Sequence, residues 1–240
     1  MKKLICLLLA LVMVMAMAAC GDENKKPYEE AVAAYNAGDY AAASAMLYVL
    51  GDYKDAAAML ASIKAEKTGV TVEATTADGT VSYEVEYIFK DGNLIKENIT
   101  YADGAVIKNY YKYNDNGLCT SETLNDLDGG KTVINHFYED GIKIRSIRTN
   151  PNKTTDTYEY TCDESGKILS HVLTLADGTV EEATYTYSDV TGWLVSIETA
   201  NGMTVYTYDQ FNNVTNEIVN INGEDVAETS YFYDYHYSVG

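Results

Sequence analysis

Residues 206–215 read YTYDQFNNVT, in which two tyrosines separated by one residue are followed by an aspartate and, shortly after it, a pair of asparagines. The alternating tyrosines favour a strand, because side chains two residues apart project from the same face of a strand. Asp and Asn favour a tight turn, since their short side chains hydrogen-bond to nearby backbone. The stretch therefore predicts a strand that ends in a turn.

Aromatic doublets of this kind recur from residue 87 onward, at an average spacing of 24 residues. They are Tyr87/Phe89, Tyr111/Tyr113, His136/Tyr138 (a degenerate copy that includes Phe137), Tyr158/Tyr160, Tyr185/Tyr187, Tyr206/Tyr208 and Tyr231/Tyr233. Because the two rings of each doublet share a face, the doublets predict an aromatic ladder down one side of a sheet. The rings either fill a core or, where exposed, offer flat surfaces to a sugar or a partner chain.

Turn signals recur along the same region about twice as often as the doublets. Asp-Gly or Asn-Gly pairs begin at residues 78, 91, 103, 116, 128, 140, 177, 201 and 222, and other turn residues fill the gaps at 152, 165, 191 and 212. These pairs are strong hairpin signals, and a spacing of about 12 residues leaves room for one strand and a tight turn. Residues 70–240 are therefore predicted to form a mainly β domain, an antiparallel meander of about 14 strands. Curling is expected, since flat open sheets rarely exceed about ten strands.

Residues 206–215 also resemble the YD repeat, or Rhs repeat, whose pattern is Y-x-Y-D-x-x-G-N-L-T. Asn212 stands where that pattern has glycine. The resemblance implies a curling antiparallel sheet in a secreted or cell-surface protein. It implies no catalytic residue.

The N-terminus has the profile of an export signal. Lys2 and Lys3 precede an apolar run that reaches residue 19, and Cys20 follows it. Residues 17–20, MAAC, resemble the lipobox of bacterial lipoproteins. The resemblance implies removal of the signal peptide 1–19, a lipid on Cys20, a lipidated linker over 20–26 and an anchor on the extracytoplasmic face of the cell membrane. Ordinary cleavage after Ala18, which leaves a freely secreted protein, is the alternative.

Residues 27–68 are rich in alanine and poor in β-branched residues, which predicts short helices before the sheet. The triplet Gly-Asp-Tyr occurs at 38–40 and again at 51–53, as a repeated turn and helix start. This segment resembles part of a tetratricopeptide unit, which implies that Ala31 faces the second helix near Ala43. Since peptide-binding grooves need about three stacked repeats, a spacer or cap is expected.

Composition and motifs exclude several functions. With 17 basic and 36 acidic residues the net charge is −19, which opposes nucleic-acid binding. The three histidines, His136, His171 and His236, lie in or beside strands without a nucleophile motif, so structural roles and no catalytic residue are expected. Asp126 and Asp128 resemble half of a calcium loop, but Asn135 occupies the position of its required glutamate. No metal site and no cofactor are predicted.

The last strand provides the candidate binding residues, because Tyr231, Tyr233, Tyr235 and Tyr237 alternate along it and a terminal strand presents an open edge. Cys119 and Cys162 are either separate thiols or a disulfide, which an exported protein permits. The sequence thus predicts a membrane-anchored lipoprotein that is not an enzyme and acts as a binding or scaffold module for a protein or glycan partner. Glycan binding by exposed tyrosines and a secreted hydrolase with an acidic pair are the alternatives.

Overall fold

The structure, a computed structural model, describes residues 23–239. The signal peptide and the first three residues of the 20–26 linker, Cys20 among them, therefore lie outside the described residues, and the last two linker residues belong to the first described helix, which begins at Lys25. The chain divides into two units, Met1–Glu66 with Tyr235–Gly240, and Lys67–Asp234. Within 23–239, no helix combines the length and apolar character that crossing a bilayer requires.

Residues 23–62 contain three short helices, as the sequence predicts: α2 (Lys25–Asn36), α3 (Tyr40–Leu50) and α4 (Ala56–Ser62). The Asp39 side chain accepts a hydrogen bond from the Ala42 backbone N–H and so caps the start of α3. Ala31 of α2 and Ala43 of α3 are fully buried, as the small residues of a tight helix pair require. Strand structure begins at Ile63, so the last six residues of the segment 27–68, which composition marks as helical, are strand instead.

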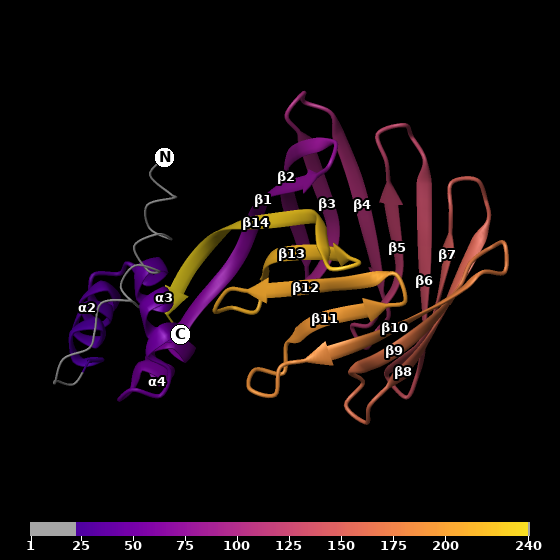
Figure 1. Ribbon diagram of the computed structural model, residues 1–240. Coiled ribbons are helices and arrows are strands. Elements are labelled where there is room, and N and C mark those ends of the chain that lie inside the picture. The colour runs from indigo at the N-terminus through magenta and orange to yellow at the C-terminus, as the bar shows by residue number, and fades with distance from the viewer. Residues whose placement is uncertain (1–22, 240) are drawn as a thin grey trace. The chain divides into compact units, whose positions relative to one another are not determined.

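Fourteen strands follow, and the sheet closes into an antiparallel barrel (Figure 1). The strands are β1 (Ile63–Thr76), β2 (Gly79–Lys90), β3 (Asn93–Tyr101), β4 (Val106–Tyr113), β5 (Cys119–Asn125), β6 (Lys131–Glu139), β7 (Ile142–Thr149), β8 (Thr155–Cys162), β9 (Ile168–Thr174), β10 (Val180–Tyr187), β11 (Leu194–Thr199), β12 (Gly202–Tyr208), β13 (Val214–Ile221) and β14 (Glu224–Val239). Each strand pairs with its neighbours in sequence, and β14 lies beside β1. The predicted mainly β meander of about 14 strands is confirmed.

Closure corrects one expectation, the open edge on the last strand. In a closed barrel β14 has a neighbour on each side, β13 and β1. Within the unit 67–234, the Thr68 hydroxyl donates to the Asp234 backbone carbonyl at 3.0 Å, and the Lys67 ammonium lies 5.2 Å from the centre of the Tyr233 ring. Closure removes the unpaired backbone that would recruit another strand.

The Asn222-Gly223 turn illustrates how the predicted turn residues act. Both residues have positive φ, 56° for Asn222 and 87° for Gly223. Two consecutive positive φ values define the type I′ hairpin turn, which matches the twist of the flanking strands and favours Asn followed by Gly. The turn joins β13 to β14 without an intervening loop.

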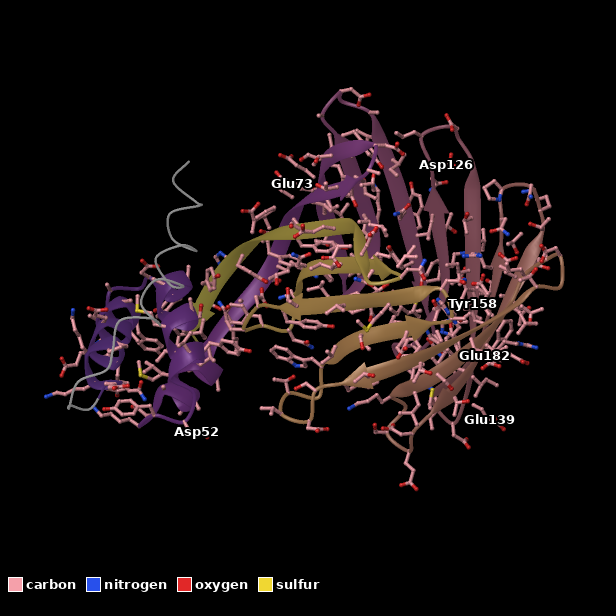
Figure 2. All side chains as sticks on the ribbon, in the orientation of Figure 1. Asp52, Glu73, Asp126, Glu139, Tyr158 and Glu182 are labelled. Atoms are coloured by element: carbon pink, nitrogen blue, oxygen red, sulfur yellow. The ribbon has the colours of Figure 1, made fainter. Side chains whose placement is uncertain are left out.

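The two faces of the barrel wall differ in chemistry. Register places Val85 opposite both Val70 and Ile99, and this face holds the buried cluster of Val70, Val72 and Val85. Tyr83, Tyr87, Tyr231 and Tyr233 pack against that cluster, so this is the inner face. Carboxylates such as Glu73 and Glu182 are exposed on the other face, and Figure 2 shows side chains standing on both sides of the wall.

Candidate functional site

The tyrosine doublets line the inner face of the barrel. Tyr111 is paired with Glu122, His136 with Ser146, and Tyr158 with both Ser146 and Leu173, which keeps these side chains on one face. The rings are partly buried, and burial raises the pKa of Tyr185 and of Tyr206 to about 12. The ladder therefore lines the interior of the barrel.

The four candidate binding tyrosines of β14 fall into two pairs, which belong to different units of the chain. Tyr231 and Tyr233 stack with ring centres 6.4 Å apart and pack against the valine cluster of the inner face. The Tyr231 hydroxyl donates to Glu217 at 3.4 Å. Tyr235 and Tyr237 belong to the other unit, where their ring centres are 5.6 Å apart. All four side chains are of intermediate exposure, so none presents a fully open ring.

A β-bulge recurs where the chain returns from the turn after each of the first six doublets. At the return into β5, Lys112 pairs with Ser121 but Tyr113 pairs with Cys119, which leaves Thr120 as an extra residue. Equivalent register shifts occur between β2 and β3, β6 and β7, β8 and β9, β10 and β11, and β12 and β13. A bulge inserts one residue and so changes which positions share a face.

This bulge brings Cys119 and Glu122 together. Three residues apart on a regular strand, their side chains would point to opposite faces. Because Thr120 is extra, Cys119 pairs with Tyr113 and Glu122 pairs with Tyr111, and both face inward with the tyrosines. The sequence prediction missed this convergence, because spacing alone carries no sign of a bulge.

His136 joins the two residues from the neighbouring strand β6. Its Nε2 lies 2.7 Å from Glu122 Oε1, and its Nδ1 lies 2.8 Å from the hydroxyl of Ser146. The Tyr160 hydroxyl donates to the same Ser146 oxygen at 3.2 Å. The ligating atoms of Cys119, Glu122 and His136 all lie within 4.8 Å of one another. We call Cys119, Glu122, His136 and Ser146 the inner polar cluster.

Ser146, His136 and Glu122 are hydrogen-bonded in the order of a hydrolase triad. Unlike the serine of such a triad, however, Ser146 is not accessible. Ser146 is only 1% exposed, and its oxygen already contacts both His136 and Tyr160. A serine nucleophile must reach the carbon that it attacks, so this serine is closed to a substrate. The cluster is better suited to hold a small species within it than to attack one outside.

The other two histidines lie apart from this cluster. His171 Nδ1 lies 3.0 Å from the Tyr185 hydroxyl, and burial lowers the pKa of His171. His236, on β14, is exposed. Neither histidine is grouped with other potential ligands in the described part of the chain.

The two described cysteines are free thiols rather than a disulfide. Cys119 belongs to the inner polar cluster, and burial together with the nearby Glu122 carboxylate raises the pKa of its thiol. The Cys162 thiol lies 3.4 Å from the Lys143 backbone carbonyl. The two cysteines therefore differ in chemistry, and only Cys119 is grouped with other potential ligands within residues 23–239.

The Asp126 side chain stabilises a turn, which is the usual role of a short carboxylate side chain at such a position. Its Oδ1 accepts a hydrogen bond from the Gly130 backbone N–H at 2.6 Å. This is the local bond by which Asp stabilises tight turns. The carboxylate that resembled half of a calcium loop is thus engaged by its own backbone.

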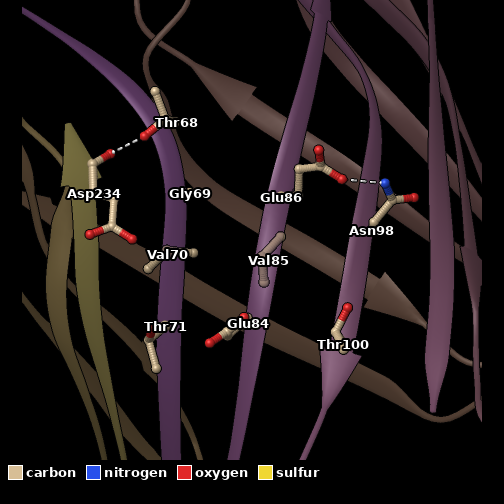
Figure 3. A pocket seen from close by; sticks show the side chains of 10 residues that line it. All are labelled: Thr68, Gly69, Val70, Thr71, Glu84, Val85, Glu86, Asn98, Thr100 and Asp234. Atoms are coloured by element: carbon tan, nitrogen blue, oxygen red, sulfur yellow. Dashed lines mark hydrogen bonds between the residues drawn. The ribbon is translucent and has the colours of Figure 1, made fainter. Parts of the chain in front are cut away.

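A shallow polar pocket lies across β1, β2 and β3 (Figure 3). It is lined by Thr68, Gly69, Val70, Thr71, Glu84, Val85, Glu86, Asn98, Thr100 and Asp234. The Asn98 amide donates to Glu86 at 2.6 Å, as the dashed line in Figure 3 marks. With the carboxylates of Glu84, Glu86 and Asp234 at its border, the pocket favours a positively charged group.

The strand, tight turn and bulged return form a structural repeat, most regular in sequence around β12. Residues 189–225 match the RHS Repeat family. The match spans β11, β12 and β13, which include the stretch 206–215. The resemblance seen in the sequence is supported there, whereas neither the lipobox nor the tetratricopeptide resemblance is shown by a match.

Solved structures provide a second comparison. The chain is similar to a porin-like protein from Bacteroides uniformis, with 13% identity, a TM-score of 0.40, and coverage of 70% of this chain and 98% of that one. A porin-like protein from Bacteroides vulgatus gives 13% identity and a TM-score of 0.43, over 71% of this chain and 99% of that one. No curated protein matches the chain.

Proposed function

We propose that the chain is an extracytoplasmic, lipid-anchored module that binds or scaffolds a partner without catalysis. The observation that carries the proposal is the chemistry of the barrel wall, whose tyrosine doublets face inward while exposed carboxylates such as Glu73 and Glu182 stand on the outer face. On β2, Glu84 and Glu86 alternate with the inward Tyr83, Val85 and Tyr87. A barrel embedded in lipid has the reverse pattern, with an apolar outer band. The outer face therefore suits water, and a lipid on Cys20 would supply the membrane attachment.

Replacing Cys20 with serine tests this attachment. We expect the wild-type chain to sediment with membranes and to be released by detergent, and the Cys20→Ser chain to appear in the soluble fraction. The reason is that two acyl chains suffice for stable anchoring, whereas the charged outer face of the barrel is costly to place in hydrocarbon. Fractionation of cells that express each chain, followed by immunoblotting, is the measurement. A Cys162→Ser chain controls for loss of a thiol, because Cys162 is not grouped with other potential ligands within residues 23–239. Retention in washed membranes of a Cys20→Ser chain that mass spectrometry shows to have lost residues 1–19 would show that the barrel itself is embedded.

The outer face also indicates the kind of partner. The chain carries a net charge of −19, and the pocket of Figure 3 is bordered by three carboxylates. Electrostatic complementarity favours a partner with a basic surface. The tyrosine doublets lie on the inner face of the barrel, and Tyr110 is exposed on the outer face without a doublet partner there. Stacking on a sugar is therefore the weaker alternative, and a protein partner is proposed.

Sedimentation with envelope material separates the two partner classes. We expect the purified full chain to pellet with intact envelope fragments, and this binding to disappear after the fragments are treated with protease. The electrostatic contribution to this binding should weaken with added salt, because salt screens exposed charges. Pelleting with protein-free wall glycan that is abolished in the Tyr233→Ala/Tyr235→Ala double variant would instead establish the glycan alternative. A Tyr48→Ala chain, altered at an exposed tyrosine of α3, is the matched control.

A further inference from the structure

We propose that Cys119, Glu122 and His136 form a binding site for a transition metal ion, with Zn²⁺ as the best fit. The three residues come from two neighbouring strands, β5 and β6, of the inner wall. Thiolate, imidazole and carboxylate are the three side-chain groups that bind zinc in proteins. The site is independent of the proposed partner binding, which concerns the outer face.

The distances suit a single ion. The potential ligand atoms, one from each residue, lie within 4.8 Å of one another. Around tetrahedral zinc, bonds of about 2.0–2.3 Å place ligand atoms about 3.3–3.8 Å apart. Side-chain adjustments of about 1 Å close the difference, and the Glu122 and His136 atoms, at 2.7 Å, need only separate slightly.

Ser146 supplies the support that a metal-binding histidine requires. Histidine ligands almost always use their second ring nitrogen in a hydrogen bond, which fixes the ring and its tautomer. The Nδ1 atom of His136 lies 2.8 Å from the buried Ser146 hydroxyl, which leaves Nε2 directed at Glu122 and available to an ion. Ser146 is itself held by the Tyr160 hydroxyl. The ring is therefore oriented before any ion arrives.

The choice of zinc follows from the mixture of ligands. A set of oxygen ligands alone would favour magnesium or calcium, whereas a thiol and an imidazole favour zinc and its neighbours in the transition series. On binding, the Cys119 S–H bond breaks and a sulfur–metal bond forms. The hydrogen through which His136 Nε2 contacts Glu122 is displaced as well, so that Nε2 ligates the ion through its lone pair while Nδ1–H donates to Ser146. The protons released pass to solvent. Three protein ligands leave a fourth position for water, as in zinc sites that are not purely structural.

Metal titration of the full chain tests the site. The wild-type chain, stripped with a chelator and purified in detergent, should bind one Zn²⁺ in competition with a chromophoric chelator. With Co²⁺ as the probe, it should show the near-ultraviolet band of a cobalt–thiolate bond. Cys119→Ser, Glu122→Gln and His136→Gln should each weaken Zn²⁺ binding by more than 10-fold. Ser146→Ala should weaken it by about 10- to 100-fold, the usual cost of losing such a supporting contact.

Two matched controls remove the same chemical groups elsewhere in the barrel. Cys162→Ser and His171→Gln should leave Zn²⁺ binding unchanged, because neither residue is grouped with other potential ligands within residues 23–239. Alkylation mapped by mass spectrometry gives a readout on the unmodified chain that needs no folded variant. Zn²⁺ should slow the alkylation of Cys119 by more than 10-fold and leave Cys162 unaffected. The proposal is overturned if the wild-type chain binds no stoichiometric Zn²⁺, if Cys119 is not protected, or if Cys162→Ser alone abolishes binding.

Discussion

Raising the pH above about 10 is expected to unfold the barrel cooperatively, because the tyrosines of its inner wall resist ionisation in the folded state. Burial raises the pKa of Tyr185, Tyr206 and Tyr233 to about 12, from 10.0 for a free side chain. A raised pKa means that the folded state binds the proton more tightly than the unfolded state does. The stability that this linkage contributes is complete below about pH 10 and is lost as the pH rises toward about 12.

Several tyrosines of the ladder act in the same direction, so the effect should be large. Burial also raises the pKa of Tyr87, Tyr111 and Tyr231, with the Glu97 carboxylate contributing at Tyr111 through a hydrogen bond. Far-ultraviolet circular dichroism and tyrosinate absorbance, recorded together against pH, are expected to change in one transition. Ionisation that is completed before any loss of ellipticity would mean that the rings are open to solvent.

A variant with three substitutions separates this linkage from general alkaline damage. Tyr185→Phe, Tyr206→Phe and Tyr233→Phe together remove three ionisable hydroxyls and keep the rings, so the unfolding midpoint should move to higher pH. The Tyr48→Phe chain removes an exposed hydroxyl on α3 and should unfold at the wild-type midpoint. A triple variant that unfolds at the wild-type pH would contradict the mechanism.

The strands were predictable because each depends on local signals. A pair such as Asn222-Gly223 specifies a hairpin by its own backbone preferences, and a tyrosine doublet specifies a face by its spacing. Repetition of these signals gives the number of strands. The start of β1 was less predictable, because Lys64, Ala65 and Glu66 have higher helix than strand propensity and are overridden by pairing farther along the chain.

Closure of the barrel is a property of the whole sheet. It depends on twist and stagger accumulated over all fourteen strands, and no single turn or strand encodes it. The prediction of an open edge on β14 was therefore wrong, although the prediction of a strand there was confirmed. The consequence for function is direct, since an edge available for strand addition is replaced by a continuous wall with distinct inner and outer faces.

The inner polar cluster was missed for a different reason. Cys119 and Glu122 share a face only because Thr120 is extra in the pairing with β4. His136, expected to be structural, lies between Glu122 and Ser146 and connects the two.

Removing the Asp156 carboxylate is expected to destabilise the barrel more than any other single change at a charged residue of the wall. Asp156, at the start of β8, is 3% exposed. One of its oxygens accepts from Arg148 Nε and from the Asn150 amide, both at 2.9 Å, and the other accepts from the Ala176 backbone N–H at 3.0 Å. These bonds connect β7, the turn that follows it and the turn between β9 and β10.

Asp156→Asn leaves the Arg148 guanidinium opposite an amide rather than a charge. Breaking a buried ion pair costs about 3–5 kcal/mol, and the lower value, about 3 kcal/mol, is expected because Arg148 is partly exposed. Urea unfolding of the two chains measures the difference. Asp177→Asn, which alters an exposed turn carboxylate that accepts from the Thr179 N–H, should cost about 1 kcal/mol or less.

Acid titration provides the independent check on Asp156. Hydrogen bonds from Asn150, followed by those from Arg148 and the Ala176 N–H, hold the pKa of Asp156 below its ordinary value of 3.8. A lowered pKa contributes stability that is present above pH 3.8 and is lost as the pH falls through the folded value. The free energy of unfolding of the wild-type chain should therefore fall more steeply below that pH than that of Asp156→Asn. Equal acid slopes in the two chains would show that the carboxylate is not the charged centre linking these three segments.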